Sequence, residues 1–190
     1  HRVEKSGRHL LGLINDVLSI SKIEAGKLAI ERRPFDPYEL IAGVAEMIRM
    51  RAEAAGLAFM VEVSRTLPVA VLGDEGKLRQ VLLNLLGNAV KYSGRARRIE
   101  MRMGSAAREA FVDVVDHGIG IPREEQERIF EKFHRVQSEE TEGIAGTGLG
   151  LAIAAGIIAD HGGLLSVDTE PGKGSTLSAV IPTATQKEQK

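Results

Sequence analysis

The sequence contains no cysteine and no long apolar run. The missing cysteine excludes disulfide bonds and thiolate metal sites, and it suits a reducing compartment. A membrane-spanning helix needs about 18 or more consecutive apolar residues, and a secretory signal needs its own short apolar segment. Neither pattern is present, so we expect a cytoplasmic chain, with any membrane anchor of its parent protein lying elsewhere.

The sequence also lacks an excess of either charge. Its 25 lysines and arginines almost balance 26 acidic residues, which leaves a formal net charge of -1. Such a balance produces no general attraction for nucleic acid or anionic membrane, so we expect neither partner. What the 190 residues do contain is 43% hydrophobic residues, enough for one main core.

The first apolar pattern is helical. From Val3 to Ile23, apolar residues recur at helical spacing, and Leu11, Ile14 and Leu18 widen the stripe. A wide stripe of this length favours a bundle helix over a long two-stranded coil, and such a helix needs a partner. Gly26 in SKIEAGK is placed to end it, and we expect a short strand at 28–30.

The later segments alternate between helical and strand patterns. Asp36 and Pro37 are placed to begin a helix that runs to about Gly56, with Glu39 completing a capping box. Further helices are expected at 75–92, 123–133 and 148–160, and strands at 57–63, 69–74, 98–103, 110–116, 164–169 and 175–181. This order predicts an α/β (α+β) fold, a two-layer sandwich of a mixed sheet with helices on one face, preceded by a separate bundle helix.

The helix expected at 75–92 carries a polar stripe. At 100° per residue, one face collects Lys77, Gln80, Asn84, Asn88 and Lys91. A solvated helix face is the ordinary explanation, but the flanking positions are apolar, so the amides should be partly buried. Amide oxygens can hold Mg²⁺ directly or through water, and a lysine can meet phosphate as a point charge. The stripe therefore suits a polar, anionic ligand.

A carboxylate and two glycine motifs follow. Alternation in AFVDVVDHGIGIP sets Asp116 on the same face as Val112 and Val114, where a buried carboxylate needs a hydrogen-bond donor. The exocyclic amine of adenine is such a donor, and Gly118 and Gly120 leave room for a flat base. Alternatively, Asp116 simply begins a glycine turn, which is a common arrangement.

The second glycine motif, GTGLGLAIAAG, places glycines 146, 148 and 150 directly before a helical pattern. Unpaired amides at a helix start form an anion site, and dinucleotides use the same arrangement. Here no strand immediately precedes the glycines and the Walker pattern is missing, which argues against a Rossmann turn or a P-loop. The preceding segment 134–147 is expected to be a mobile lid.

The order of the motifs indicates a family. NLLGNAVKYS, DHGIGIP, IFEKFHRV, GTGLGLAI and GKGST resemble the N, first glycine, F, second glycine and third glycine boxes of sensor histidine kinases of the GHKL ATPase superfamily. Upstream, HLLGLINDVLSISKIEAGKL is similar to the second helix of their dimerisation and histidine-phosphotransfer domain. The resemblance implies part of that domain at 1–26, a Bergerat-type ATP-binding domain at 27–183 and a flexible tail at 184–190.

The resemblance also implies ATP and Mg²⁺ as cofactors and assigns residues to them. Asn88 would be the metal ligand, and Asn84, Asn88 and Lys91 would form the catalytic group. The implied nucleotide-binding residues are Asn84, Asn88, Lys91, Tyr92, Asp116, Gly118, Gly120, Ile121, Arg135, Gly146, Thr147, Gly148, Leu149, Gly150 and Thr176. His117 departs from the family, which more often has Asn or Thr there.

The implied reaction is transfer of the ATP γ-phosphoryl to a histidine, for onward transfer to a response regulator. The motif that carries the acceptor histidine is missing, since the similarity through SGRHLLGLIND places His1 on the second helix. We therefore expect the acceptor on another helix of the same protein. The full-length protein is expected to dimerise through its helical bundle.

Three other functions share some of these features. DNA topoisomerase and chaperone ATPases of the same fold usually carry Glu in place of Asn84, and anti-sigma serine kinases lack the bundle helix. A binding module without transfer activity is disfavoured by the intact Asn88, Lys91 and Asp116.

Overall fold

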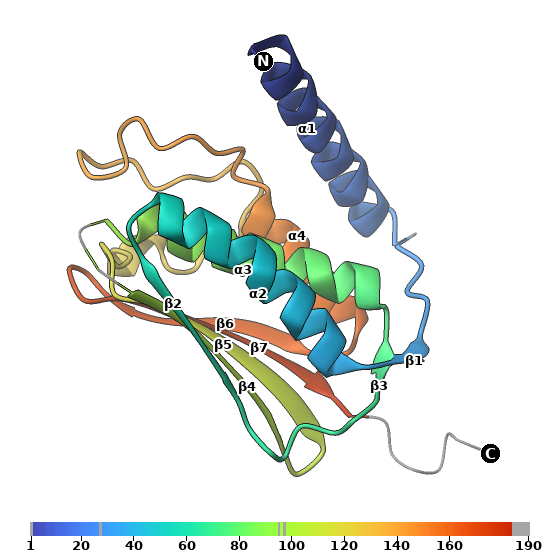
Figure 1. Cartoon of the computed structure of the whole chain (residues 1–190). Coiled ribbons are helices and arrows are strands. Elements are labelled where there is room, and N and C mark those ends of the chain that lie inside the picture. Colours follow the sequence, from blue (N-terminus) through green and yellow to red (C-terminus); the bar gives the residue numbers. More distant parts are fainter. Residues whose placement is uncertain (1, 27, 95, 97, 184–190) are drawn as a thin grey trace.

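The computed structural model describes residues 2–26, 28–94, 96 and 98–183 (Figure 1). Its helices are α1 (Arg2–Glu24), α2 (Pro37–Ala54), α3 (Glu75–Tyr92) and α4 (Gly150–Asp160), with 3-10 turns η1 (Arg123–Glu125) and η2 (Arg128–Phe130). Its strands are β1 (Arg33–Phe35), β2 (Ala58–Val63), β3 (Val71–Gly73), β4 (Arg98–Ala106), β5 (Glu109–Asp116), β6 (Leu164–Glu170) and β7 (Gly174–Pro182). The interpretations of His1 and of the tail at 184–190 concern residues outside those described. Among the described residues, no helix combines the length and apolarity needed to cross a membrane.

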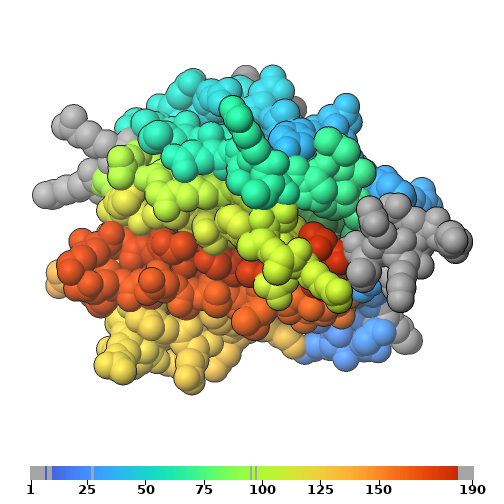
Figure 2. Space-filling view, turned by 90° about the horizontal axis from the view of Figure 1, so that it is seen from below, coloured from blue at the N-terminus to red at the C-terminus, as the bar shows by residue number. Residues whose placement is uncertain are grey.

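Five strands form one mixed sheet in the order β2-β4-β5-β7-β6. β2 is parallel to β4, and the other pairs are antiparallel. Helices α2, α3 and α4 cover one face of this sheet (Figure 1), while Figure 2 shows the opposite face with its strands open to view. The expected two-layer sandwich is therefore confirmed.

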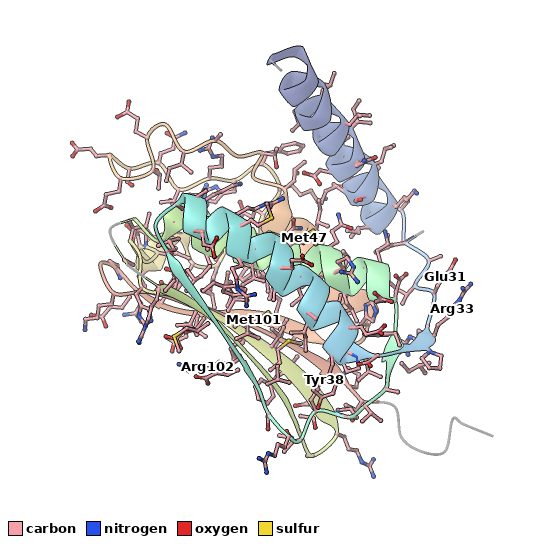
Figure 3. All side chains as sticks on the ribbon, viewed as in Figure 1. Glu31, Arg33, Tyr38, Met47, Met101 and Arg102 are labelled. Atoms are coloured by element: carbon pink, nitrogen blue, oxygen red, sulfur yellow. The ribbon has the colours of Figure 1, made fainter. Side chains whose placement is uncertain are left out.

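The core lies between the helices and the sheet. In β5 the side chains of Val112 and Val114 point into this layer, and their neighbours in register are Met103 and Met101 of β4. Met101 is fully buried, whereas Arg102 lies on the open side of the sheet (Figure 3). The period of two thus separates an apolar face from a charged one.

Side-chain caps fix the first residues of helices α2 and α3, which begin where the sequence predicted. The carboxylate of Asp36 accepts a 2.7 Å hydrogen bond from the Tyr38 amide at the start of α2. Asp74 accepts one of 3.0 Å from the Lys77 amide at the start of α3. Each bond satisfies an amide that the helix itself leaves without a partner. α3 then spans 75–92 as expected and buries its apolar stripe.

Three elements of the structure differ from those that the sequence predicted. No strand forms at 28–30, because Leu28 packs on the core and the pairing edge of β3 is taken by β1. Residues 123–133 form two 3-10 turns rather than one helix. Ile129 is the only buried residue in these two turns, so a single side chain holds the segment to the core. Helix α4 begins at residue 150 rather than 148, because Gly148 has a φ of 71° that no α-helix allows.

Helix α1 is not separate from the helical layer but packs on α4. Ile20 is buried. Ile23 packs closely on Gly156 of α4, because a Cβ added to Gly156 would lie only 2.8 Å from the Cδ1 of Ile23. An ion pair joins Glu24 to Lys132. Much of the apolar stripe of α1, including Leu11 and Leu18, remains exposed.

Candidate functional site

A cavity of about 610 Å³ opens between α3, the end of β5, the start of α4, the segment 134–147 and helix α1. The sequence-predicted residues that line it are Asn84, Asn88, Lys91, Tyr92, Asp116, Gly120, Ile121, Arg135, Gly146, Thr147, Gly148 and Gly150. These residues come from four separate motifs. The fold therefore brings most of the candidate residues to one place.

The carboxylate of Asp116 lies at the cavity wall, and this residue is 8% exposed. Its Oδ1 accepts a 2.9 Å hydrogen bond from the Gly118 amide. Burial raises the pKa of Asp116, while hydrogen bonds from the Gly118 and Ser175 amides and the nearby His117 partly lower it. Two backbone amides therefore orient the carboxylate but leave it able to accept from a ligand.

The glycines beside Asp116 allow close backbone contacts. A Cβ on Gly118 would lie 2.0 Å from the carbonyl oxygen of Tyr92, and one on Gly120 would lie 2.1 Å from that of Glu170. Gly120 also has a φ of 67°, which side chains rarely adopt. Any other residue at 118 would push the turn away from the end of α3, and any other residue at 120 would push it away from the end of β6.

Along α3, the amides of Asn84 and Asn88 are half-buried at the cavity wall. The Asn84 Nδ2 donates a 2.9 Å hydrogen bond to the carbonyl oxygen of Gly150, which leaves its Oδ1 as an acceptor. No side chain caps the first turn of α4 that begins there. The Asn84 contact thus fixes a helix start whose amides are available to an anion.

Positive charge collects beside this helix start. The Lys91 Nζ and the Arg135 Nε lie 4.0 and 3.9 Å from the point that a Cβ on Gly146 would occupy. Burial lowers the pKa of Lys91, and the charges of Arg135 and Arg51 lower it further, while Asp16 raises it. Desolvation and like-charge repulsion both disfavour the ammonium form, so this part of the cavity favours an anion.

The segment 134–147 is held by several local contacts. The Arg135 guanidinium donates to the carbonyl oxygen of Ile144. Thr141 is buried, and its hydroxyl donates to the Val136 carbonyl oxygen at 2.8 Å. His134, which also lines the cavity, forms a hydrogen bond with Glu125. That the segment acts as a mobile lid stays a prediction.

Three predicted residues do not line the cavity. Gly118 packs against the Tyr92 backbone behind it, and Leu149 is 1% exposed in the core. Thr176 belongs to the opposite face of β7, and its neighbour Ser175, which pairs with Asp116, lines the cavity instead. The period-two alternation from Leu177 would have identified Ser175.

Other lining residues carry no sequence signal. Arg51 comes from the last turn of α2, and Gly12, Leu13 and Asp16 come from α1. Burial raises the pKa of Asp16, and the positive charge of Lys91 partly opposes this. Only the packing of α1 on α4 and of α2 on α3 places these residues at the cavity.

His117 lies on the open face of the sheet, although it directly follows Asp116. Its Nε2 lies 3.1 Å from a carboxylate oxygen of Glu100, which is 4% exposed. The His117 hydrogen bond lowers the pKa of Glu100, burial opposes this, and Arg102 and Arg98 lower it further. This group ties the end of β5 to β4 from the side opposite the cavity.

Comparisons with known proteins show what this chain is similar to. Residues 73–185 match the family described as histidine kinase-, DNA gyrase B-, and HSP90-like ATPases. The circadian input-output histidine kinase CikA of Synechococcus elongatus is 37% identical over 184 residues, which cover 96% of this chain and 24% of CikA. The non-motile and phage-resistance protein of Caulobacter vibrioides is 39% identical over 185 residues, covering 95% of this chain and 22% of that protein.

A solved structure is also similar. Full-length ShkA in complex with AMPPNP superposes with a TM-score of 0.83 at 37% identity, over 95% of this chain and 37% of ShkA. The chain thus spans about a quarter of the length of the two curated relatives. Its chain-wide match to such proteins confirms the resemblance drawn from the motifs. The chain belongs to the histidine kinase-, DNA gyrase B-, and HSP90-like ATPase family, and it is the ATPase catalytic part of the sensor histidine kinase type.

Proposed function

We propose that this chain binds ATP with Mg²⁺ and presents its γ-phosphoryl group to a histidine side chain of the same parent protein. The observation that carries the proposal is the polarity of the cavity. The cavity wall carries a buried carboxylate, Asp116, and two cations, Lys91 and Arg135, that both lie near Gly146. A nucleotide has the matching groups, a donor-bearing base and an anionic tail.

Adenine recognition is assigned to Asp116. Its carboxylate would accept from the exocyclic amine, oriented by the Gly118 amide that it already binds. Tyr92, Gly120 and Ile121 would line the base site, because all three border the same cavity. A buried acceptor of this kind discriminates strongly against bases that lack the amine.

The phosphate tail is assigned to the positive groups. Lys91, Arg135 and the amides around Gly146, Gly148 and Gly150 would contact the phosphates. The uncapped first turn of α4 supports this assignment.

The metal is assigned to α3. Asn88 would hold Mg²⁺ with Asn84 nearby, and the fit rests on the free Oδ1 that the Gly150 contact leaves on Asn84. Bound Mg²⁺ would neutralise phosphate charge and orient the transferred group. Asn84, Asn88 and Lys91 act by positioning and charge, which is the main demand of phosphoryl transfer.

The partners are proposed from the same assignment. Residues 1–26 would form one helix of a dimeric bundle, joined to a catalytic domain at 27–183, and the exposed Leu11 and Leu18 of α1 suit such a bundle. The acceptor histidine would lie on another helix of the parent, which would pass the phosphoryl group to a response regulator. Because the reaction consumes ATP, we expect this part of the parent in the cytoplasm.

Calorimetric titration with a non-hydrolysable ATP analogue and Mg²⁺ tests the binding step. We expect saturable binding that Asp116→Ala abolishes. Asp113→Ala is the matched control, because Asp113 lies on the same strand but on the open face of the sheet, beside Arg102. An unmodified, folded chain that binds no analogue would refute the proposal.

Phosphoryl transfer is tested in the full-length parent. Incubation with γ-labelled ATP should label a histidine, and Asn88→Ala should remove the label. Labelling that survives Asn88→Ala at the unmodified rate would contradict the role given to the α3 amides.

A further inference from the structure

Arg51 lies at the cavity although no sequence motif includes it. It occupies the last turn of α2, and it lines the same cavity as Lys91 and Arg135. Its charge is close enough to Lys91 to lower the pKa of that ammonium group. Three cations from α2, α3 and the segment 134–147 therefore line one cavity, and the charges of two of them act on the third.

Negative charge in this cavity is scarce. Among the described residues that line the cavity, the acidic side chains are Asp16 and Asp116. The Asp116 carboxylate accepts from the Gly118 amide, whereas the charge of Asp16 of α1 acts on Lys91 and raises its pKa. Three positive groups facing one carboxylate repel one another unless a ligand brings further negative charge.

Among the described ion pairs, Arg79 differs from Arg51 in having an acidic partner. Arg79 of α3 forms a 2.6 Å ion pair with Glu75 one turn earlier, which satisfies its guanidinium within the helix. In the part of the chain that the structure describes, no comparable ion pair holds Arg51. Its guanidinium is thus available to a ligand, and a guanidinium can meet phosphate through two parallel hydrogen bonds.

We propose that Arg51 binds the phosphate chain of the nucleotide as a third cation beside Lys91 and Arg135, and that it sets the preference of this site for nucleotides with more phosphates. The inference rests on the proposed function, because it concerns the same cavity. It adds a residue of α2 to the binding group. Arg51 contributes through charge and hydrogen bonding at the tail and does not contact the base.

The test compares three ligands on the Arg51→Gln variant. Affinities for adenosine, ADP and a non-hydrolysable ATP analogue are measured by calorimetry with Mg²⁺. We expect the affinity for the ATP analogue to fall about tenfold, that for ADP to fall less and that for adenosine to change by less than about twofold. Arg51→Lys should recover part of the loss, because it keeps the charge but not the paired donors.

Arg49→Gln is the matched control. Arg49 lies on the same helix and is exposed, but it does not line the cavity, so its removal should leave all three affinities unchanged. Thermal unfolding of each variant checks that it is folded. An Arg51→Gln variant that binds the ATP analogue normally would overturn the inference, and so would one that loses adenosine and ATP analogue equally.

The same titrations separate the two proposals. If the unmodified chain binds the ATP analogue and Arg51→Gln does not weaken it selectively, only the role of Arg51 fails. If the unmodified chain binds none of the three ligands, the nucleotide function and this inference both fail.

Discussion

Two buried carboxylates on neighbouring strands have opposite surroundings. Asp116 at the end of β5 faces the cavity and has backbone amides as partners, and burial raises its pKa. Glu100 in β4 faces the open side of the sheet, where His117, Arg102 and Arg98 lower its pKa. Glu100 is therefore satisfied within the protein, whereas Asp116 still has acceptor capacity for a ligand. Burial alone therefore does not distinguish a carboxylate that is free to accept from a ligand, and the partners of the carboxylate must be considered as well.

The largest expected effect comes from Asp116→Asn. The change removes a charged acceptor from the proposed adenine site, so the ATP affinity should fall about 100-fold. The unfolding free energy should stay equal or rise, because the amide avoids the burial penalty that raises the pKa of Asp116. Calorimetry and chemical denaturation measure the two effects, and a large loss of stability would show that Asp116 is structural.

Glu100→Gln should give the reverse result. It removes the negative charge that His117, Arg98 and Arg102 contact, so the unfolding free energy should fall by about 1–3 kcal/mol. The ATP affinity should change by less than about threefold, because Glu100 lies on the face opposite the cavity. Chemical denaturation measures the change in unfolding free energy, and calorimetry measures the change in ATP affinity. A selective loss of ATP affinity would contradict the contrast between the two carboxylates.

The two carboxylates should also respond oppositely to pH. The folded-state pKa of Glu100 is lowered, so its stabilisation is present above its unfolded pKa and is lost as pH falls through the folded value. The pKa of Asp116 is raised, so the folded state binds its proton more tightly, and the contribution of Asp116 to stability falls as pH rises through the folded value.

Denaturation of the unmodified chain, Glu100→Gln and Asp116→Asn between about pH 3 and 7 checks these signs. The stability advantage of the unmodified chain over Glu100→Gln should shrink as the pH falls. Relative to Asp116→Asn, the unmodified chain should instead lose stability as the pH rises. Parallel pH profiles for all three proteins would refute the assigned surroundings.

The smallest expected effect is at Asp16. Its carboxylate partly neutralises Lys91 and would repel phosphate, so Asp16→Asn should strengthen metal-free ATP binding by about twofold to fivefold. Titration in the presence of a chelator isolates this charge effect from Mg²⁺. Weaker metal-free binding by the variant would show that Asp16 supports the site instead of opposing it.

Local signals predicted much of the fold and one side of the site. The predicted cap at Asp36 placed α2, the helical pattern placed α3, and alternation put Asp116 on the same face as Val112 and Val114, because these signals depend on neighbouring residues. Arg51 and Asp16 were missed because their positions depend on how α2 and α1 pack on other helices. The alternation that would have favoured Ser175 over Thr176 was present in the sequence.

The most direct test of the central claim is the discrimination between ATP and ITP. Inosine carries a carbonyl oxygen in place of the exocyclic amine, so it offers the Asp116 carboxylate an acceptor where adenine offers a donor. We predict that the unmodified chain prefers the ATP form by about 100-fold or more and that Asp116→Asn, which keeps measurable binding, removes most of this preference. Equal affinities for the two nucleotides in the unmodified chain would contradict adenine recognition by Asp116.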